Sequence, residues 1–303
     1  MPSFLSLLTR EQIRLLKPVL KKISIARGRT FQDALGRLGA QSVAGRVRFE
    51  PVRLEQAPAC FALPVAETDQ SRALLYLHGG GFVAGNMKYA CGFAGILADK
   101  LQRRVLSVAY RLAPEHPFPA ALEDALAAYR YLLDQGWAAG QISLVGESAG
   151  GGLVYSLCLK LKALGLPLPA SLVAISPWAD LTLSGPSYTA NAKKDPSLSL
   201  QILRSYASIY ADGQERNPLV SPVFGDLAGL PPSLLLAGGD ELLLSDAMTL
   251  HAGLKARGCA SALYVEPGLW HVYVLYKIPE ARLAMQRIAA FLALEDGGVY
   301  GRA

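Results

Sequence analysis

Short apolar runs alternate with longer amphipathic segments along most of the chain. The runs are bounded by glycine, proline or charged residues, as buried strands usually are. The segments between them carry apolar residues at helical spacing. This alternation predicts an α/β fold with a mostly parallel central sheet and helices on both of its faces. The expected strands are 73–77, 105–109, 142–145, 172–176, 233–237 and 262–265, and the expected helices are 88–102, 119–134, 149–164, 246–257 and 280–294.

Two stretches do not belong to this alternation. The spacing between the strands expected at 172–176 and 233–237 is about twice that of the others, which is too long for a single connection between a strand and a helix. A helical pattern at 199–211 lies inside this insertion. The second surplus stretch is the N-terminal 42 residues, which precede an antiparallel pair of strands expected at 46–54 and 60–65.

The N-terminal stretch contains signals for two helices. Thr9 and Gln12 resemble a capping box that opens the first helix, and Thr30 is a candidate cap for the second. We predict that residues 1–42 and the insertion 177–230 form a cap over the sheet. The expected main domain then comprises 43–176 and 231–303.

The composition is typical of a globular protein. Of the 303 residues, 51% are hydrophobic and 18% are charged, which allows a large buried core. The net charge of +6 comes from scattered lysines and arginines, so no nucleic-acid partner is expected. There is no apolar stretch of membrane-spanning length and no signal-peptide pattern in residues 1–9. We expect a cytoplasmic protein without a membrane span.

The cysteines lie far apart, without the paired spacing of a disulfide framework or a zinc site. They are Cys60, Cys91, Cys158 and Cys259. The sequence therefore indicates neither a structural metal nor a cofactor.

The most specific chemical signal is the segment Gly146-Glu147-Ser148-Ala149-Gly150, which follows an apolar strand and opens a helix rich in small residues. This context is that of a nucleophile elbow, a tight turn that exposes a serine hydroxyl at a helix N-terminus. The small residues at 146, 149 and 150 fit such a turn. Ser148 is therefore the candidate nucleophile.

A second signal follows the strand expected at 73–77, where His78 precedes three glycines that end at Gly81. Glycines leave backbone N–H groups unobstructed, and such groups can bind the negative oxygen that develops on an attacked carbonyl. We expect His78 to support this loop through hydrogen bonds.

His271 is the candidate general base. It lies in the loop after the last expected strand, and it follows both Ser148 and an acidic cluster; His251 follows them too, but it lies inside the helix expected at 246–257. That order of serine, acid and histidine is the one used by the α/β-hydrolase fold. The acidic cluster leaves two candidates for the acid, Asp240 and Glu241, since both directly follow the strand expected at 233–237.

With these residues, the chain resembles the hormone-sensitive-lipase-like family of α/β-hydrolase carboxylesterases, of the bacterial type, over nearly its whole length. The matching motifs are His78 to Gly81, Tyr110 to Glu115, Phe118 to Ala121, Gly146 to Gly150, Ser176 to Thr182, and Pro267-Gly268 followed by His271. One departure is Glu147, which stands where many members carry aspartate or threonine.

The resemblance implies a metal-independent carboxylesterase with a helical cap, acting on small esters of short to medium acyl chain. It implies that N–H groups of Gly80, Gly81 and Ala149 hold the oxyanion. Members carry a further acidic residue four or five positions after the triad acid, and Asp246 lies five after Glu241 and six after Asp240, so the resemblance favours Glu241. A homodimer is a further expectation from the family.

Two other functions use the same fold. The family includes a ligand receptor that has lost the catalytic histidine, whereas His271 is present here. An amidase or aryl-acyl hydrolase would use the same machinery, and the sequence does not separate it from an esterase.

Overall fold

The computed structural model describes residues 1–20, 24–66 and 71–296. In these ranges eight strands form one sheet in the order β1-β2-β4-β3-β5-β6-β7-β8. The strands are β1 (Val47–Arg53), β2 (Pro58–Pro64), β3 (Ala73–Leu77), β4 (Arg104–Val108), β5 (Ile142–Glu147), β6 (Ser171–Ile175), β7 (Ser233–Gly238) and β8 (Ser261–Glu266). Strands β3 to β8 pair in parallel, while β2 is antiparallel to β1 and β4. This arrangement confirms the predicted fold class.

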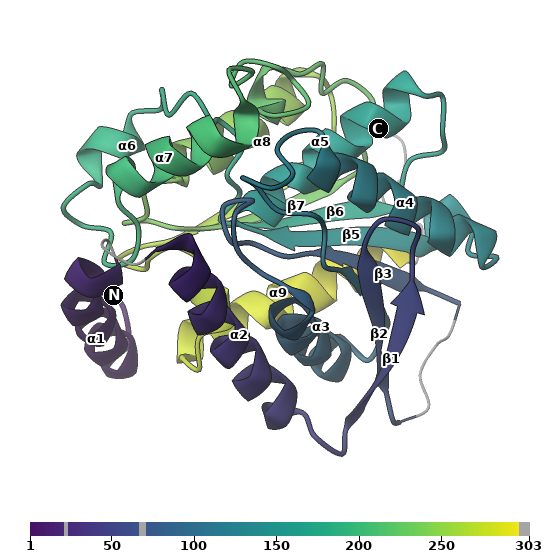
Figure 1. Ribbon diagram of the computed structural model, residues 1–303, viewed down its shortest axis with the longest axis horizontal. Coiled ribbons are helices and arrows are strands. Elements are labelled where there is room, and N and C mark those ends of the chain that lie inside the picture. Colours follow the sequence, from purple (N-terminus) through teal and green to yellow (C-terminus); the bar gives the residue numbers. More distant parts are fainter. Residues whose placement is uncertain (21–23, 67–70, 297–303) are drawn as a thin grey trace.

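Helices cover both faces of the sheet (Figure 1). They are α1 (Phe4–Leu20), α2 (Ile25–Ser42), α3 (Met87–Leu101), α4 (Ala120–Asp134), α5 (Ala149–Ala163), α6 (Ser187–Ala190), α7 (Leu200–Ala211), α8 (Leu244–Ala256) and α9 (Pro279–Asp296), with short 3₁₀ helices at Ala139–Gln141, Pro222–Phe224 and Tyr273–Leu275. None of the helices in the described ranges has the length and apolar content needed to cross a bilayer.

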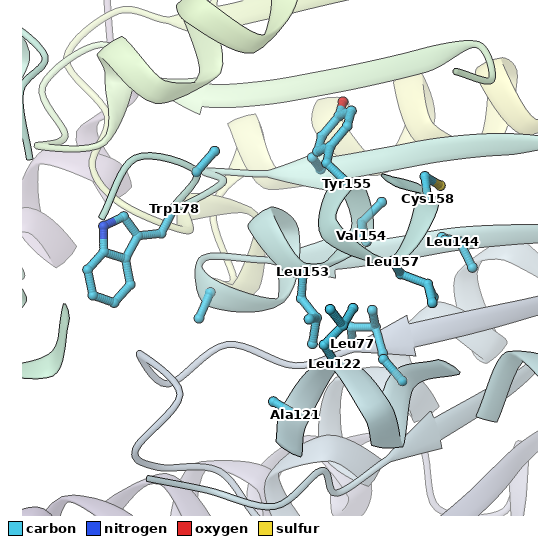
Figure 2. Packing of buried hydrophobic residues seen from close by; sticks show 14 of the residues in the cluster. Leu77, Ala121, Leu122, Leu144, Leu153, Val154, Tyr155, Leu157, Cys158 and Trp178 are labelled. Carbon is cyan, nitrogen blue, oxygen red and sulfur yellow. The ribbon is translucent and has the colours of Figure 1, made fainter. Parts of the chain in front are cut away.

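The two faces of the sheet bury different apolar clusters, because successive strand residues point to opposite sides. In β3, Leu75 and Leu77 join the cluster under α4, α5 and α8, whereas Leu74 and Tyr76 join the cluster under α3 and α9. Figure 2 shows the first cluster, with Leu153 of α5 near Leu77. All five residues of β3 are buried, which explains its continuous apolar sequence.

The predicted helix starts at Thr9 and Thr30 are wrong. Helix α1 begins earlier, at Phe4, because Glu280 accepts hydrogen bonds from the backbone N–H and hydroxyl of Ser3 and from the hydroxyl of Ser6, and so fixes the first turn from outside. Helix α2 begins after Ser24, whose side chain accepts from the N–H of Arg27. Thr30 lies inside α2 and donates back to the carbonyl of Ala26, as helical threonines often do.

The two surplus stretches meet near the ends of the strands. Helices α1 and α2 come from the N-terminal stretch, and α6 and α7 come from the insertion; they lie at the side of the molecule where the parallel strands end (Figure 1). That edge is the usual ligand site of open α/β sheets. The division into cap and main domain stays a prediction.

Candidate active site

Ser148 lies in a sharp turn between β5 and α5. Its backbone has φ 56° and ψ −123°, a conformation that costs a non-glycine residue energy and is held only by its surroundings. A Cβ atom on Gly146 would lie 2.3 Å from the carbonyl oxygen of Gly150, and one on Gly150 would lie 2.0 Å from that of Leu77. Only glycine fits either position, so the small residues of the motif are required by close backbone packing.

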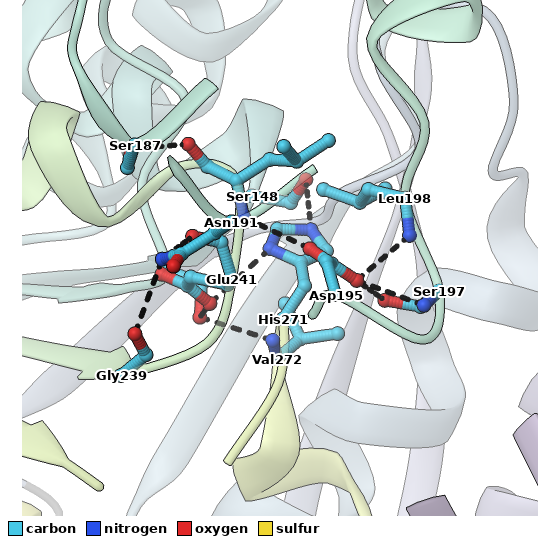
Figure 3. A network of polar contacts seen from close by, with 12 residues as sticks. Ser148, Ser187, Asn191, Asp195, Ser197, Leu198, Gly239, Glu241, His271 and Val272 are labelled. Carbon is cyan, nitrogen blue, oxygen red and sulfur yellow. Dashed lines mark hydrogen bonds and ion pairs between the residues drawn. The ribbon is translucent and has the colours of Figure 1, made fainter. Parts of the chain in front are cut away.

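The hydroxyl of Ser148 faces His271. The Nε2 atom of His271 lies 2.9 Å from Ser148 Oγ (Figure 3), although 123 residues separate them in the sequence. His271 is buried, with 5% of its surface exposed. Two of the other histidines have different partners: His78 Nδ1 lies 2.7 Å from the carbonyl oxygen of Gly79, and His251 Nδ1 lies 2.9 Å from Ser261 Oγ.

Of the two candidate acids, the structure turns only Glu241 toward the histidine. Glu241 Oε2 lies 3.6 Å from His271 Nδ1, and Glu241 is fully buried. Asp240 points away and pairs with Arg10 at 2.6 Å. A distance of 3.6 Å is longer than a hydrogen bond, as is common for catalytic groups without substrate.

Ser176 joins two loops. The acid loop follows β7 and carries Glu241, and the histidine loop follows β8 and carries His271. Its hydroxyl donates to Glu241 Oε2 at 2.6 Å and accepts from the N–H of Val272 at 3.0 Å. Burial raises the pKa of Glu241 above its ordinary value, while His271 and Ser176 oppose that rise. Ser176 is thus a second partner of the Glu241 carboxylate, besides His271, and it lies directly after β6. Its position at a strand end is the signal by which the sequence marks it.

Two side chains of the insertion hold the acid loop in place. Asn191 Nδ2 donates to the carbonyl oxygens of Gly239 and Glu241, at 3.1 and 2.9 Å. Asp195 Oδ2 accepts from the N–H of Leu242 at 2.9 Å. Figure 3 shows both residues beside Glu241. No motif in the sequence pointed to them, because their role depends only on where the insertion folds back.

Arg10 of α1 links three loops around the site. Its guanidinium donates to Asp240 at 2.6 Å, to the carbonyl oxygen of Gly268 at 2.7 Å and to that of Lys194 at 2.9 Å. The N-terminal helix thereby contacts the acid loop, the histidine loop and the insertion together. No motif around Arg10 indicated this role.

The glycine loop, His78 to Gly81, lies next to Ser148. Gly80 and Gly81 have φ of 116° and 65°, and Ser148 Cβ lies 3.0 Å from the Cβ position of Gly79. Among the described residues, no group accepts a hydrogen bond from the N–H of Gly80, Gly81 or Ala149. Such free donors beside a nucleophile can bind a developing oxyanion.

The insertion covers this loop with aromatic rings. A Cβ atom on Gly81 would lie 2.5 Å from the ring of Tyr206, so the ring lies directly against the backbone. Phe82 and Tyr210 stack with their centroids 3.7 Å apart. No cluster of His, Cys, Asp or Glu suited to a metal ion occurs in the part of the chain that the structure describes.

The fold and these loops define the class of protein. A model of the α/β-hydrolase fold family matches residues 74–275, and the chain belongs to that family. Within it the chain belongs to the hormone-sensitive-lipase-like esterases, which are serine hydrolases that cleave ester bonds.

Individual relatives support this placement. An acetyl-hydrolase of Streptomyces hygroscopicus is 40% identical over 262 residues, covering 85% of this chain and 88% of the relative. An esterase of Acinetobacter venetianus is 33% identical over 272 residues, covering 88% of each chain. A crystal structure of a bacterial hormone-sensitive-lipase-family esterase matches with a TM-score of 0.90 and 36% identity, over 96% of this chain and 98% of the other.

Proposed function

We propose that the protein is a carboxylesterase that hydrolyses small esters of short to medium acyl chain. Ser148 is the nucleophile, His271 the general base and Glu241 the acid that orients it. The observation that carries this proposal is the 2.9 Å contact between His271 Nε2 and Ser148 Oγ at the elbow, since nucleophile and base must lie within hydrogen-bond reach.

The reaction proceeds through an acyl-enzyme. His271 takes the Ser148 proton as the hydroxyl oxygen attacks the ester carbonyl, and the N–H groups of Gly80, Gly81 and Ala149 stabilise the tetrahedral oxyanion. His271 then protonates the leaving alcohol. Water, activated by the same histidine, releases the acid and regenerates Ser148. Glu241 stabilises the imidazolium formed in both steps.

The acyl-chain preference follows from the cap and from the relatives. We assign residues 1–42 and 177–230 to the cap, because Tyr206 of the insertion lies against the glycine loop and Arg10 of α1 reaches the acid loop. A ring over the loop leaves limited room for a long acyl chain. Relatives named acetyl-hydrolase and ethyl acetate hydrolase also favour short chains.

The test is hydrolysis of p-nitrophenyl esters with acyl chains from acetate to palmitate, by the wild type and by Ser148→Ala. We expect Ser148-dependent turnover with the highest kcat/KM on the acetate to hexanoate esters. No Ser148-dependent turnover on any ester would contradict the proposal and favour a binding protein. Faster turnover of matched anilides would favour an amidase.

A further inference from the structure

Glu147, the residue before the nucleophile, has a fully buried side chain that the mechanism above does not use. Its carboxylate faces three donors. Oε1 accepts from the N–H of Gly79 at 2.6 Å and from Tyr89 Oη at 3.1 Å, and Oε2 accepts from Tyr76 Oη at 2.8 Å. The acidic side chain is therefore built into the turn beneath the glycine loop.

The bond to Gly79 sits at the start of that loop. The next two residues, Gly80 and Gly81, carry the N–H groups assigned to the oxyanion. The preceding carbonyl, that of His78, accepts from Tyr110 Oη at 2.6 Å. The loop is thus fixed at its first residues by one carboxylate and one phenol, and its left-handed glycines have little stiffness of their own.

We propose that Glu147 is a positioning residue for the ester hydrolysis proposed above, holding Gly79, and with it the Gly80 and Gly81 donors, at the oxyanion through its ionised carboxylate. The inference rests on that proposed function. It assigns Glu147 no contact with substrate.

The ionised form matters because the carboxylate then accepts all three hydrogen bonds at full strength, including the one from the Gly79 N–H, which can only donate. In a protonated Glu147 one oxygen carries the proton, which a phenol can accept, and Gly79 is left with an uncharged carboxyl acceptor. An ionised acceptor also forms the shorter and stronger bonds. Protonation is therefore expected to loosen the loop at Gly79.

The groups around Glu147 set the pKa of its carboxyl group near neutral pH. Burial raises the pKa of Glu147 to about 7, while the bonds from Gly79, Tyr76 and Tyr89 oppose the rise. Tyr110 also faces the carboxylate, and burial raises the pKa of all three phenols, which stay neutral. Burial lowers the pKa of the neighbouring His78 to about 4, so that ring is neutral above that pH.

The sign of the effect follows from these values. The pKa of Glu147 is higher in the folded protein than in the unfolded chain, so the protonated form stabilises the fold. This contribution to stability is lost as pH rises through about 7. Activity runs the other way, because the loop needs the ionised form. Activity should fall as pH falls through about 7, in addition to the requirement of any histidine base for its neutral form.

The first experiment measures the acid limb of kcat/KM on p-nitrophenyl butyrate. Two required deprotonations give a limb that steepens toward about 100-fold per pH unit, whereas one gives about 10-fold. We expect the steeper limb for the wild type and the shallower one for Glu147→Gln, whose amide oxygen still accepts from Gly79. An unchanged slope in Glu147→Gln would overturn the proposal.

Two milder variants keep the ring volumes and guard against misfolding. Tyr76→Phe and Tyr89→Phe each remove one donor to the ionised carboxylate, which raises the pKa of Glu147. The acid limb should shift to higher pH, further for Tyr76→Phe because its bond is shorter. An acid limb that stays in place in both variants would contradict the proposal.

The second experiment uses Glu147→Leu, which removes the acceptor altogether. We expect kcat to fall by about 10²-fold, comparable to losing one oxyanion donor, with KM changed by less than about threefold. Affinity for an alkyl trifluoromethyl ketone, whose adduct has an oxyanion, should fall in parallel. An unchanged kcat would overturn the proposal.

The matched control is Asp246→Asn. Asp246 is another buried carboxylate with three donors, the N–H groups of Ala179 and Asp180 and the hydroxyl of Tyr188, but it does not touch the glycine loop. We expect a lower melting temperature and a wild-type acid-limb slope. If Asp246→Asn also flattens the limb, the effect belongs to buried carboxylates in general and the proposal fails.

A measurement without substrate separates this inference from the proposed function. Hydrogen exchange of the backbone over residues 78–84 should be faster in Glu147→Leu than in the wild type, and unchanged in Asp246→Asn. If the wild type turned over esters no faster than Ser148→Ala, the esterase proposal would be refuted. The hydrogen-exchange result would still decide the role of Glu147. Equal exchange in wild type and Glu147→Leu would refute that role.

Discussion

The two halves of the candidate site are built in different ways. The nucleophile half is contiguous in sequence: Gly146 to Gly150 form one turn, held by backbone contacts of glycines. The acid half is assembled from distant segments, because Glu241 is held by Ser176 and Asn191, which lie 65 and 50 residues away. A local turn can be recognised in a motif, whereas an assembled carboxylate depends on the whole fold.

This difference has an energetic side. The elbow stores strain at Ser148, with a φ of 56°, and surrounding strands hold that strain in place. The acid loop instead relies on side-chain hydrogen bonds from the insertion, each worth about 1 kcal/mol net. The acid half should therefore tolerate small losses gradually, while the nucleophile half depends on one atom.

The largest expected effect is that of Ser148→Ala. Removing a serine nucleophile lowers kcat by about 10⁶-fold in a serine protease, and we expect loss of turnover to background here. The change removes one oxygen from a turn and no core volume, so the melting temperature should stay near the wild-type value. Wild-type rates in protein free of contaminating esterase would show that the reacting group lies elsewhere.

The second-largest effect is expected for Glu241→Gln, which is compared with the same change at the neighbouring Asp240. Mutation of a triad acid to its amide costs about 10⁴-fold in kcat in serine proteases, so Glu241→Gln should lose several orders of magnitude. Asp240→Asn breaks only the ion pair with Arg10, and its kcat should stay within about tenfold of the wild type. The measurement is kcat on p-nitrophenyl butyrate for both variants.

The reverse order of these two variants would assign the acid role to Asp240. A circular dichroism spectrum and melting curve for each variant provide the control. They separate a lost catalytic group from a lost fold.

A smaller effect is expected where the insertion holds the acid loop. Asn191→Ala removes two hydrogen bonds and leaves the carbonyls of Gly239 and Glu241 without their donor. We expect kcat to fall about tenfold and stability to fall by about 1–3 kcal/mol, measured by kinetics and thermal unfolding.

Asn217→Ala is the matched control within the same insertion. Among the described residues, the side chain of Asn217 bonds to nearby Gln214 and Leu219 and not to the acid loop. Its kcat should equal that of the wild type. Equal losses in both variants would show that the insertion acts through general stability rather than through the acid loop.

The smallest expected effect is that of a chelator. Proton transfer through His271 and oxyanion binding by backbone N–H groups need no metal ion in either half of the site. Excess EDTA should leave kcat/KM unchanged after prolonged incubation. A strong loss, restored by added metal, would require a different mechanism.

The sequence by itself determined the fold class and marked Ser148 and His271 as candidate site residues. Buried parallel strands appear as continuous apolar runs, so the six strands from β3 to β8 were found within one or two residues. The elbow was recognisable because Gly146 packs against Gly150 within one turn, and because the strand before that turn and the helix after it adjoin it in the sequence. The predicted starts of the first two helices were wrong, because Glu280 and Ser24 decide those starts and the pattern around Thr9 and Thr30 does not.

Only the tertiary structure decided which way the acids point. Asp240 and Glu241 are adjacent and satisfy the same local pattern, but Arg10 of α1 draws one away and Ser176 holds the other beside His271. The same holds for Asn191, whose partners lie about fifty residues further along the chain. Directions of neighbouring side chains depend on partners that folding brings from other segments, and a local pattern carries no record of those partners.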